Sequence, residues 1–470
     1  MIVNSIIFLL FFVIVFASYY ILRNKRSGQN ALLLIASCFF YGFTNWKILP
    51  LLLFSILFIY LIGIIISKSE NKKADIYTII GIVFGVGLLF YFKYLNFFIE
   101  SFTTTFNAIG LHCNPWSFNI IMPLGISFFT FKLISYVIDI KRKTIEPSKD
   151  FISFATYISF FPTILSGPID KSSHFLPQLQ KARSFDYHLA VDGCRQILWG
   201  MFKKMVIADN LSLFIERDIA TSNGSTLFIV AIFYSIQIYA DFSGYSDMAI
   251  GVGKLLGFNI TSNFRYPYFS KSIGEFWRRW HISLLSWFRE YIYFPLGGSR
   301  CSKIKVIRNT FLIFLVSGLW HGANWTFVIW GIFHALLFIP SILFIKTTTK
   351  HSLDEKTPLT WRYLLNMVTI FLLITLGWVI FRMESIEQIV LYLSKICSSS
   401  LFYKPQGVIW ALVPFILSVF MFVFEWIQFD KEFPLQMEGK KWIRWGIYIT
   451  LIILIVFYQG KSTDFIYFKF

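Results

Sequence analysis

Two histidines in tryptophan-rich sequence have the side chains best suited to catalysis in this chain. His281 follows Trp280 and His321 follows Trp320, 40 positions apart (321 minus 281). An imidazole titrates near neutrality, so it can take a proton from a hydroxyl that attacks an acyl group and later deliver it to the leaving group. Burial keeps an imidazole neutral, the form that a general base requires. We therefore predict His321 and His281 as catalytic residues, which only tertiary folding can bring together.

Polar and aromatic side chains near the two histidines are candidates for holding a substrate. The three arginines close to His281 could bind the phosphate of a carrier or cofactor, and at a membrane surface they could equally hold lipid head groups. Asn324 and the neighbouring tryptophans could shape a cavity beside His321. The predicted substrate-binding residues are Trp277, Arg278, Arg279, Trp280, Arg289, Trp320, Asn324, Trp325, Asp241 and Ser243. The other histidines, His112, His174, His188, His334 and His351, are expected to be packed or loop residues.

Asp241 and Ser243 belong to a polar segment that directly follows the apolar run 226–239. Carboxylates next to such a run are costly unless they face protein or water, so they favour a functional or structural polar centre. The alternative is that Asp241 or Ser243 caps a separate helix over 248–256. The sequence leaves both interpretations open.

Composition indicates the environment in which these residues act. The 470 residues are 56% hydrophobic and 14% charged, which excludes a soluble globular protein. Apolar runs of the length that a bilayer core requires, about 20 residues, recur along the chain. The formal charge of +18 comes from basic residues in short loops, which is typical of orientation signals and anionic lipid contacts, not of nucleic-acid binding. The five cysteines are scattered, so we predict no structural disulfide and no metal site.

The fold class that follows is an all-α polytopic membrane protein with about ten to twelve membrane helices. The expected spans include residues 2–22, 31–46, 48–67, 76–98, 122–140, 363–380, 408–424 and 442–457. Basic and non-basic loops alternate through the first third, which predicts an N-terminus outside and basic loops in the cytoplasm. We expect one membrane domain over 1–470, with N-terminal helices at 1–149, a catalytic core at 150–346 and C-terminal helices at 347–470. Segment 189–207 mixes charged and apolar residues, which favours a helix in the interface or packed against others.

The segment 309–345 is too long for one straight crossing. Its 37 residues would make a helix of roughly 55 Å, so it must break or turn. Gly318 and Gly322 flank His321 and could supply the backbone freedom for a break. Since both ends of the segment are basic, a hairpin from one membrane face is expected, with His321 roughly 18 Å into the bilayer. Irregular backbone at that depth requires surrounding protein or a water-filled cavity.

Several motifs together resemble the membrane-bound O-acyltransferase family. They are Trp-His-Ile-Ser at 280–283, Arg-Glu-Tyr-Ile-Tyr at 289–293, Pro-Leu-Gly-Gly at 295–298, Trp-His-Gly-Ala-Asn-Trp at 320–325 and Tyr-Ala-Asp-Phe-Ser-Gly-Tyr-Ser-Asp at 239–247. Phe-Pro at 161–162, Ser-Gly-Pro-Ile at 166–169 and the aromatic tail, which we expect at a membrane interface, extend the likeness. The likeness is to the bacterial membrane subunits of alginate and peptidoglycan O-acetyltransferases. The D-alanyl transfer protein of teichoic acid synthesis is more distant.

The resemblance implies broken helices around a central tunnel, with His321 as the catalytic histidine and His281 as the second family histidine. It also implies a bacterial inner-membrane enzyme that takes an acetyl group from acetyl-CoA on the cytoplasmic side and passes it outward to a polysaccharide. A partner acyltransferase in the cell envelope often completes the transfer, and no metal or tightly bound cofactor is expected. Glu290 stands where this branch usually has Asp, and the retained charge predicts little effect.

Other functions remain open on the sequence. The acyl group could be D-alanyl or another acyl group. A transporter of a lipid-linked sugar would use the broken helix as a gated path, although the sequence has no internal repeat, and a non-catalytic scaffold would only recruit an envelope acetyltransferase. No Walker loop, dinucleotide fingerprint or zincin motif is present, which argues against an ATP-driven pump and metal-dependent hydrolysis.

Overall fold

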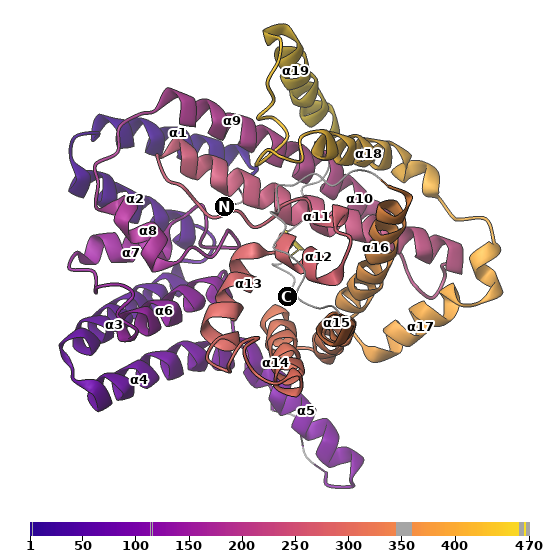
Figure 1. Ribbon diagram of the computed structural model, residues 1–470, viewed down its shortest axis with the longest axis horizontal. Helices are drawn as coiled ribbons and strands as arrows, with labels where there is room; N and C mark the ends of the chain where they lie inside the picture. The colour runs from indigo at the N-terminus through magenta and orange to yellow at the C-terminus, as the bar shows by residue number, and fades with distance from the viewer. Residues whose placement is uncertain (2, 113, 115, 345–359, 460–464, 467–470) are drawn as a thin grey trace. The chain divides into compact units, whose positions relative to one another are not determined.

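The protein is an all-α polytopic membrane protein, here described from a computed structural model (Figure 1). The structure describes residues 1, 3–112, 114, 116–344, 360–459 and 465–466. Its helices group in two compact units: Met1–Val191 with Val252–Thr261, called unit 1, and Asp192–Gly251 with Ser262–Phe470, called unit 2. The expected division of one domain into three parts stays a prediction.

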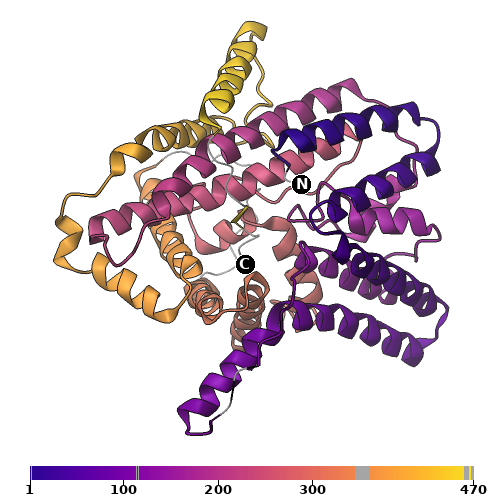
Figure 2. The same cartoon turned by 180° about the vertical axis from the view of Figure 1, so that it is seen from behind.

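Unit 1 contains the N-terminal helices. Its helices are α1 (Ile6–Ile21), α2 (Arg26–Gly42), η1 (Trp46–Ile48), α3 (Leu49–Lys68), α4 (Asn71–Leu89), η2 (Phe90–Tyr94), α5 (Leu95–Ala108), α6 (Ile126–Lys141), α7 (Phe151–Ser159) and α8 (Ser172–Leu179). The helices α3, α4 and α6 pack together, as both cartoon views show (Figure 2). Buried polar groups join other parts of this unit: the Asn30 amide nitrogen donates to the Ser153 hydroxyl at 2.9 Å and to the Leu179 carbonyl at 2.9 Å.

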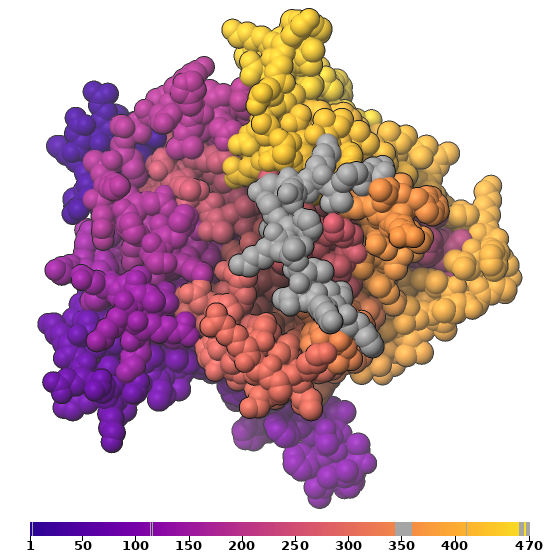
Figure 3. Space-filling model, in the orientation of Figure 1, coloured from indigo at the N-terminus to yellow at the C-terminus, as the bar shows by residue number. Residues whose placement is uncertain are grey.

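Unit 2 contains the helices that carry the predicted site, except that residues 187–191 of α9 and 252–255 of α11 belong to unit 1. They are α9 (Tyr187–Met201), η3 (Phe202–Ala208), α10 (Asp209–Ile215), α11 (Gly224–Leu255), η4 (Pro267–Phe269), α12 (Ile273–Arg279), α13 (Ile282–Phe288), η5 (Arg289–Tyr293), α14 (Lys303–His321), α15 (Trp325–Phe344), α16 (Trp361–Arg382), α17 (Ile386–Ile396), η6 (Ser399–Phe402), η7 (Val408–Ala411), α18 (Leu412–Ile427) and α19 (Lys441–Tyr458). The last helix, α19, projects from its unit (Figure 3), and only 11% of its residues are buried.

Among the described residues, six helical segments are long and apolar enough to cross a membrane. They are Trp46–Lys68, Asn71–Ala108, Gly224–Leu255, Trp325–Leu343, Trp361–Arg382 and Lys441–Tyr458, and the shorter apolar helices are Ile6–Ile21 and Leu412–Ile427. Most expected spans coincide with a helix within a few residues. The count of ten to twelve crossings stays a prediction, because length and composition alone do not identify that many.

One expected span has a different length. The span expected at 76–98 is part of a longer run, Asn71–Ala108, in which a π-helical turn separates α4 from α5.

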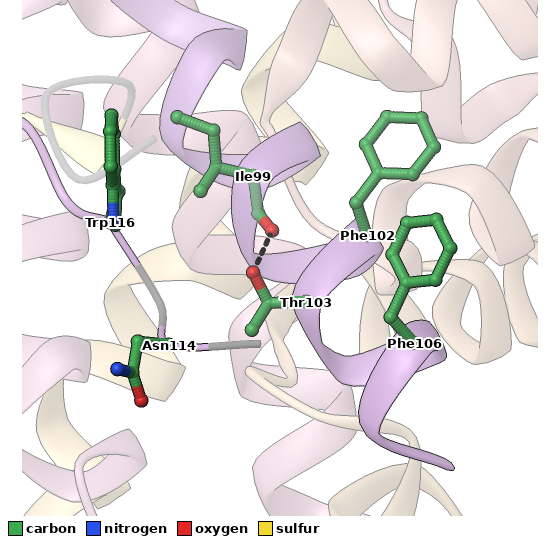
Figure 4. A pocket seen from close by; sticks show the side chains of 6 residues that line it. All are labelled: Ile99, Phe102, Thr103, Phe106, Asn114 and Trp116. Carbon is green, nitrogen blue, oxygen red and sulfur yellow. Dashed lines mark hydrogen bonds between the residues drawn. The ribbon is translucent and has the colours of Figure 1, made fainter. Parts of the chain in front are cut away.

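A pocket of about 320 Å³ lies beside α5, lined by Ile99, Phe102, Thr103, Phe106, Asn114 and Trp116 (Figure 4). No predicted site residue lines this pocket. The apolar run 151–165 remains helical only to Ser159, where the backbone leaves the helix ahead of Pro162.

The helix α11 is continuous through the polar segment 239–247. It runs for 32 residues, so the interpretation that Asp241 or Ser243 caps a new helix is wrong. Both side chains are buried inside the helix bundle, at 2% and 1% exposure. The other interpretation, a functional or structural polar centre, agrees with this burial, and a functional role stays a prediction.

The segment 309–345 turns as expected. The chain leaves α14 after His321 and enters α15 at Trp325. The reason given for the turn is wrong, however. Gly318 lies within α14, and Gly322 has a φ of −164°, an extended conformation that any residue adopts. The depth of His321 in a bilayer stays a prediction.

Candidate active site

The α14–α15 hairpin positions His321 at the end of α14. The two helices approach closely, because a Cβ atom at Gly318 would clash with the Phe327 carbonyl oxygen and one at Gly331 would clash with that of Phe314. Small residues permit such contact between membrane helices. The buried His321 ring contacts Trp330 of α15 and Phe381 of α16, with 5.2 and 5.1 Å between ring centroids.

His281 is held between α12 and α13 in an unusual backbone conformation. Its φ of 47° and ψ of 51° are left-handed, and it forms the N-cap position of α13. The side chain is 1% exposed, and its ring packs edge-on against Phe242 of α11 at 4.7 Å. His281 lies outside the candidate membrane-spanning helices, and burial lowers its pKa to about 3. The ring is therefore neutral at physiological pH.

Trp320 brings the two predicted catalytic histidines to one place. Its ring centroid lies 5.8 Å from that of His281 and 5.0 Å from that of His321. The three side chains come from α14 and from the α12–α13 junction, and all are buried. The structure thus joins residues 40 positions apart (321 minus 281) around a single indole.

Trp277, on α12, and Trp280, directly after its last residue, take different positions. Trp277 contacts Trp330 and His334 of α15 at 5.7 and 4.9 Å between ring centroids, so it belongs with the His321 cluster. Trp280 instead packs among core aromatic side chains of α11 and η4, including Tyr239 and Tyr268.

The predicted arginines lie in three environments. Arg279 is buried and paired with Glu275, with 2.9 Å between Nη2 and Oε1, and it also donates to the Arg265 carbonyl at 3.1 Å. Arg278 is exposed. Arg289 is exposed too, and its guanidinium lies 6.0 Å from the centre of the Phe294 ring. Only the two exposed arginines are open to a phosphate or a lipid head group.

The residues that follow His321 begin the next helix. The Asn324 side chain accepts from the Thr326 backbone N–H at 3.0 Å and donates to the Glu384 carbonyl at 2.7 Å. Asn324 thereby satisfies an N–H at the start of α15, a common role for asparagine. Trp325 is 52% exposed.

Asp241 is the acceptor of a buried charge network. Lys204 lies 2.7 Å from Asp241 and 2.8 Å from Asp209, and the neighbouring Lys203 pairs with Asp247 at 2.6 Å. Segment 189–207 therefore packs against other helices, one of the two placements expected from its sequence. Buried pairs of this kind are costly to break, because one partner would remain as an uncompensated charge. Asp241 is thus held structurally.

The aromatic tail also meets Asp241. The Ile466 backbone N–H donates to Asp241 Oδ2 at 2.8 Å, and Phe465 packs against Tyr245 with 5.0 Å between ring centroids. Both tail residues are buried, and the expected location of the tail at a membrane interface stays a prediction. The rest of the tail, 464 and 467–470, lies outside the described residues, as does His351.

Sequence reasoning missed the polar face of α15. Thr326, Trp330 and His334 are spaced four residues apart, so they share one face of the helix, and all three are fully buried. That spacing is readable in the sequence. The His334 ring lies 4.7 Å from Trp330 and 4.9 Å from Trp277, so it is packed, as expected, but next to the predicted site.

The described residues provide nitrogen donors and aromatic walls at this site. Among them, no group of three or more His, Cys, Asp and Glu side chains could hold a metal ion. The four described cysteines, Cys38, Cys194, Cys301 and Cys397, are free. The expectation that no metal is bound stays a prediction.

Comparison with known proteins decides the family. A sequence model of the membrane-bound O-acyltransferase family matches residues 38–383, which include both histidines. The chain belongs to this family. As a membrane-bound O-acyltransferase, it is an enzyme, so a purely transporting or scaffolding role is displaced as its main function.

Three relatives show the range of this likeness. The chain is 40% identical to the probable alginate O-acetylase AlgI of Pseudomonas aeruginosa over 395 residues, covering 82% of this chain and 73% of the relative. It is 35% identical to the peptidoglycan O-acetyltransferase of Helicobacter pylori, covering 79% and 75%. It is 32% identical to the teichoic acid D-alanyltransferase of Bacillus subtilis, covering 56% and 69%.

Proposed function

We propose that this O-acyltransferase moves an acetyl group from acetyl-CoA onto hydroxyls of an exported or cell-envelope polysaccharide. The observation that carries the proposal is the meeting of His281 and His321 at Trp320, within a family of O-acyltransferases. The named activities of the alginate and peptidoglycan relatives support acetyl as the group and a polymer as the acceptor. The D-alanyltransferase relative supports D-alanyl as the second candidate, over a shorter part of the chain.

His321 would act as the general base. It takes the proton of the acceptor hydroxyl while the oxygen attacks the acyl carbonyl carbon, so a new C–O bond forms. The thioester C–S bond then breaks, and the proton passes from His321 to the departing thiolate. The acceptor hydroxyl belongs either to a sugar or to a relay residue of a partner acyltransferase in the envelope.

His281 would line the donor side and orient the thioester. Its neutral ring and fixed backbone support a positioning role, since a ring that stays neutral provides one N–H donor and one acceptor. Arg278 and Arg289, both exposed, are the arginines suited to the phosphates of the donor or to lipid head groups. We place the enzyme in the inner membrane with its N-terminus outside, on the alternation of basic loops.

The test uses a strain that lacks this protein, complemented with variants and examined by mass spectrometry of its envelope glycans. We expect wild type to restore O-acetyl groups and His321→Ala to restore none, because no other described side chain is expected to act as the base. His188→Ala is the matched control, since His188 is exposed and lies in unit 1. Full O-acetylation by His321→Ala would contradict the role of His321 as the base, and D-alanyl groups in place of acetyl would favour the second candidate.

A further inference from the structure

The α15 face beside His321 carries three buried polar side chains. Thr326, Trp330 and His334 are 0% exposed in a helix that is mostly apolar. Among the described residues, the Thr326 hydroxyl, the Trp330 Nε1 and both His334 ring nitrogens have no hydrogen-bond partner. A buried donor without a partner costs about 1–3 kcal/mol, so a single helix face with three such groups requires an explanation.

A fourth buried group without a partner lies next to this face, on another helix. Trp277 of α12 is 6% exposed, and its Nε1 also has no partner among the described residues. The three rings form a closed triangle, with 4.9 Å between the centroids of Trp277 and His334, 4.7 Å between Trp330 and His334, and 5.7 Å between the two tryptophans. The helices α12 and α15 thus bring two indole rings and an imidazole together.

The position of His334 is fixed by α16. A Cβ atom at Gly377 would lie 2.6 Å from His334 Nε2, so only glycine admits the imidazole at this distance. Phe314 of α14 also packs against the ring, with 6.1 Å between ring centroids. Contacts with both helices restrict the movement of the imidazole.

The chemistry of these groups defines the ligand. An indole N–H can only donate, so the cluster suits a hydrogen-bond acceptor such as a carbonyl oxygen. Trp330 also contacts His321, with 5.2 Å between ring centroids, so an oxygen bound here lies beside the proposed base. Donors that point to a developing negative oxygen in a dry site stabilise the transition state of acyl transfer.

We propose that Trp277, Trp330 and His334 form a donor site for the carbonyl oxygen of the acyl group, and that it stabilises the negative charge on this oxygen during transfer. The inference rests on the proposed function, because it assigns this oxygen in the reaction of His321. When the acceptor hydroxyl adds to the carbonyl carbon, the C=O electron pair moves onto the oxygen and returns when the C–S bond breaks. Thr326 lies one turn further along the same face and extends the polar surface.

The test measures transfer of labelled acetyl from acetyl-CoA in membranes that contain the full chain. Trp330→Phe and Trp277→Phe retain an aromatic ring and remove only the N–H, and we expect kcat to fall about 10- to 100-fold with little change in KM for acetyl-CoA. His334→Phe should lose as much, whereas His334→Gln keeps a donor and should retain more activity. The indole N–H groups have no protein partner, so Trp330→Phe and Trp277→Phe should lose stability only because phenylalanine has a smaller ring than tryptophan.

Trp378→Phe is the matched control. Trp378 is equally buried, at 1% exposure, but its Nε1 already donates to the Tyr268 hydroxyl at 3.2 Å. This variant should therefore melt below Trp330→Phe and yet keep a kcat near that of wild type. The proposal is overturned if Trp330→Phe and His334→Phe keep wild-type kcat, or if Trp378→Phe loses as much as they do. His321→Ala separates the two claims, since wild-type transfer by that variant would contradict the proposed function itself.

Discussion

At the scale of single residues, the site depends on side chains whose protonation and orientation are set by packing. His281 has a left-handed backbone, which is uncommon outside glycine and asparagine, and its ring is enclosed by Phe242 and Trp320. Burial lowers the pKa of this imidazole to about 3, from an ordinary value of 6.5. A group with a depressed pKa links folding to pH.

The pH dependence of stability tests this state. The unfolded chain binds a proton at His281 near pH 6.5, whereas the folded protein does so only near pH 3, so this contribution to stability is complete above pH 6.5 and is lost as the pH falls towards 3. The loss is at most about 1.4 kcal/mol per pH unit. The temperature of thermal unfolding in detergent should fall less between pH 7 and pH 5 for His281→Asn than for wild type. Asparagine tolerates the left-handed backbone at this position and does not titrate. His188 is exposed, so His188→Asn should behave like wild type. If the unfolding temperature of all three proteins changed equally with pH, a neutral His281 would be disproved.

The sequence identifies some of these residues and not others, for physical reasons. The placement of His281 and His321 beside tryptophans is visible in the sequence, and their meeting at Trp320 is not, because it depends on tertiary contacts. The buried pair of Glu275 and Arg279 was readable from its spacing of four on α12, and it removes Arg279 from the arginines open to a ligand. The sequence gives no sign that His334 lies beside the site, because the groups that surround its ring come from α12, α14 and α16. These helices meet α15 only in the folded protein.

At the scale of elements, the α14–α15 hairpin is the unit that positions His321. Length alone predicted the turn, since 37 residues exceed one crossing. The role of glycine was misjudged, because Gly318 and Gly331 act through close helix contact and not through backbone freedom at the turn. The continuity of α11 was also undecided from the sequence, because the buried lysines that pair with its carboxylates lie far from it in the chain.

A substitution at the hairpin contact tests this role. Gly331→Ala places a methyl group against the Phe314 carbonyl oxygen, and we expect it to cost about 1–3 kcal/mol of stability and to reduce acyl transfer by separating α14 from α15. Gly446→Ala is the control, because a Cβ atom at that position of α19 meets nothing within 4 Å. In the control, the unfolding temperature should be unchanged or slightly higher, and the rate of acetyl transfer should be unchanged or slightly higher too. An equal effect of the two substitutions would argue against the hairpin contact as the determinant.

At the scale of the whole molecule, composition and loop charge carry most of what could be predicted. An apolar chain with basic short loops requires membrane helices, and the described residues form helices over nearly all the expected spans. The number of crossings and the path of the acyl group do not follow from hydropathy, because helices that pack inside the protein need not be apolar. The buried pairs of Lys203 and Lys204 illustrate this in η3.

The account depends most on acyl transfer at His321 from the cytoplasmic side. The direct measurement is incorporation of labelled acetyl from acetyl-CoA supplied to inverted membrane vesicles, in which the cytoplasmic face is outward. We predict incorporation with wild type, none with His321→Ala and none in right-side-out vesicles, since acetyl-CoA does not cross the membrane. Wild-type incorporation by His321→Ala would contradict the account.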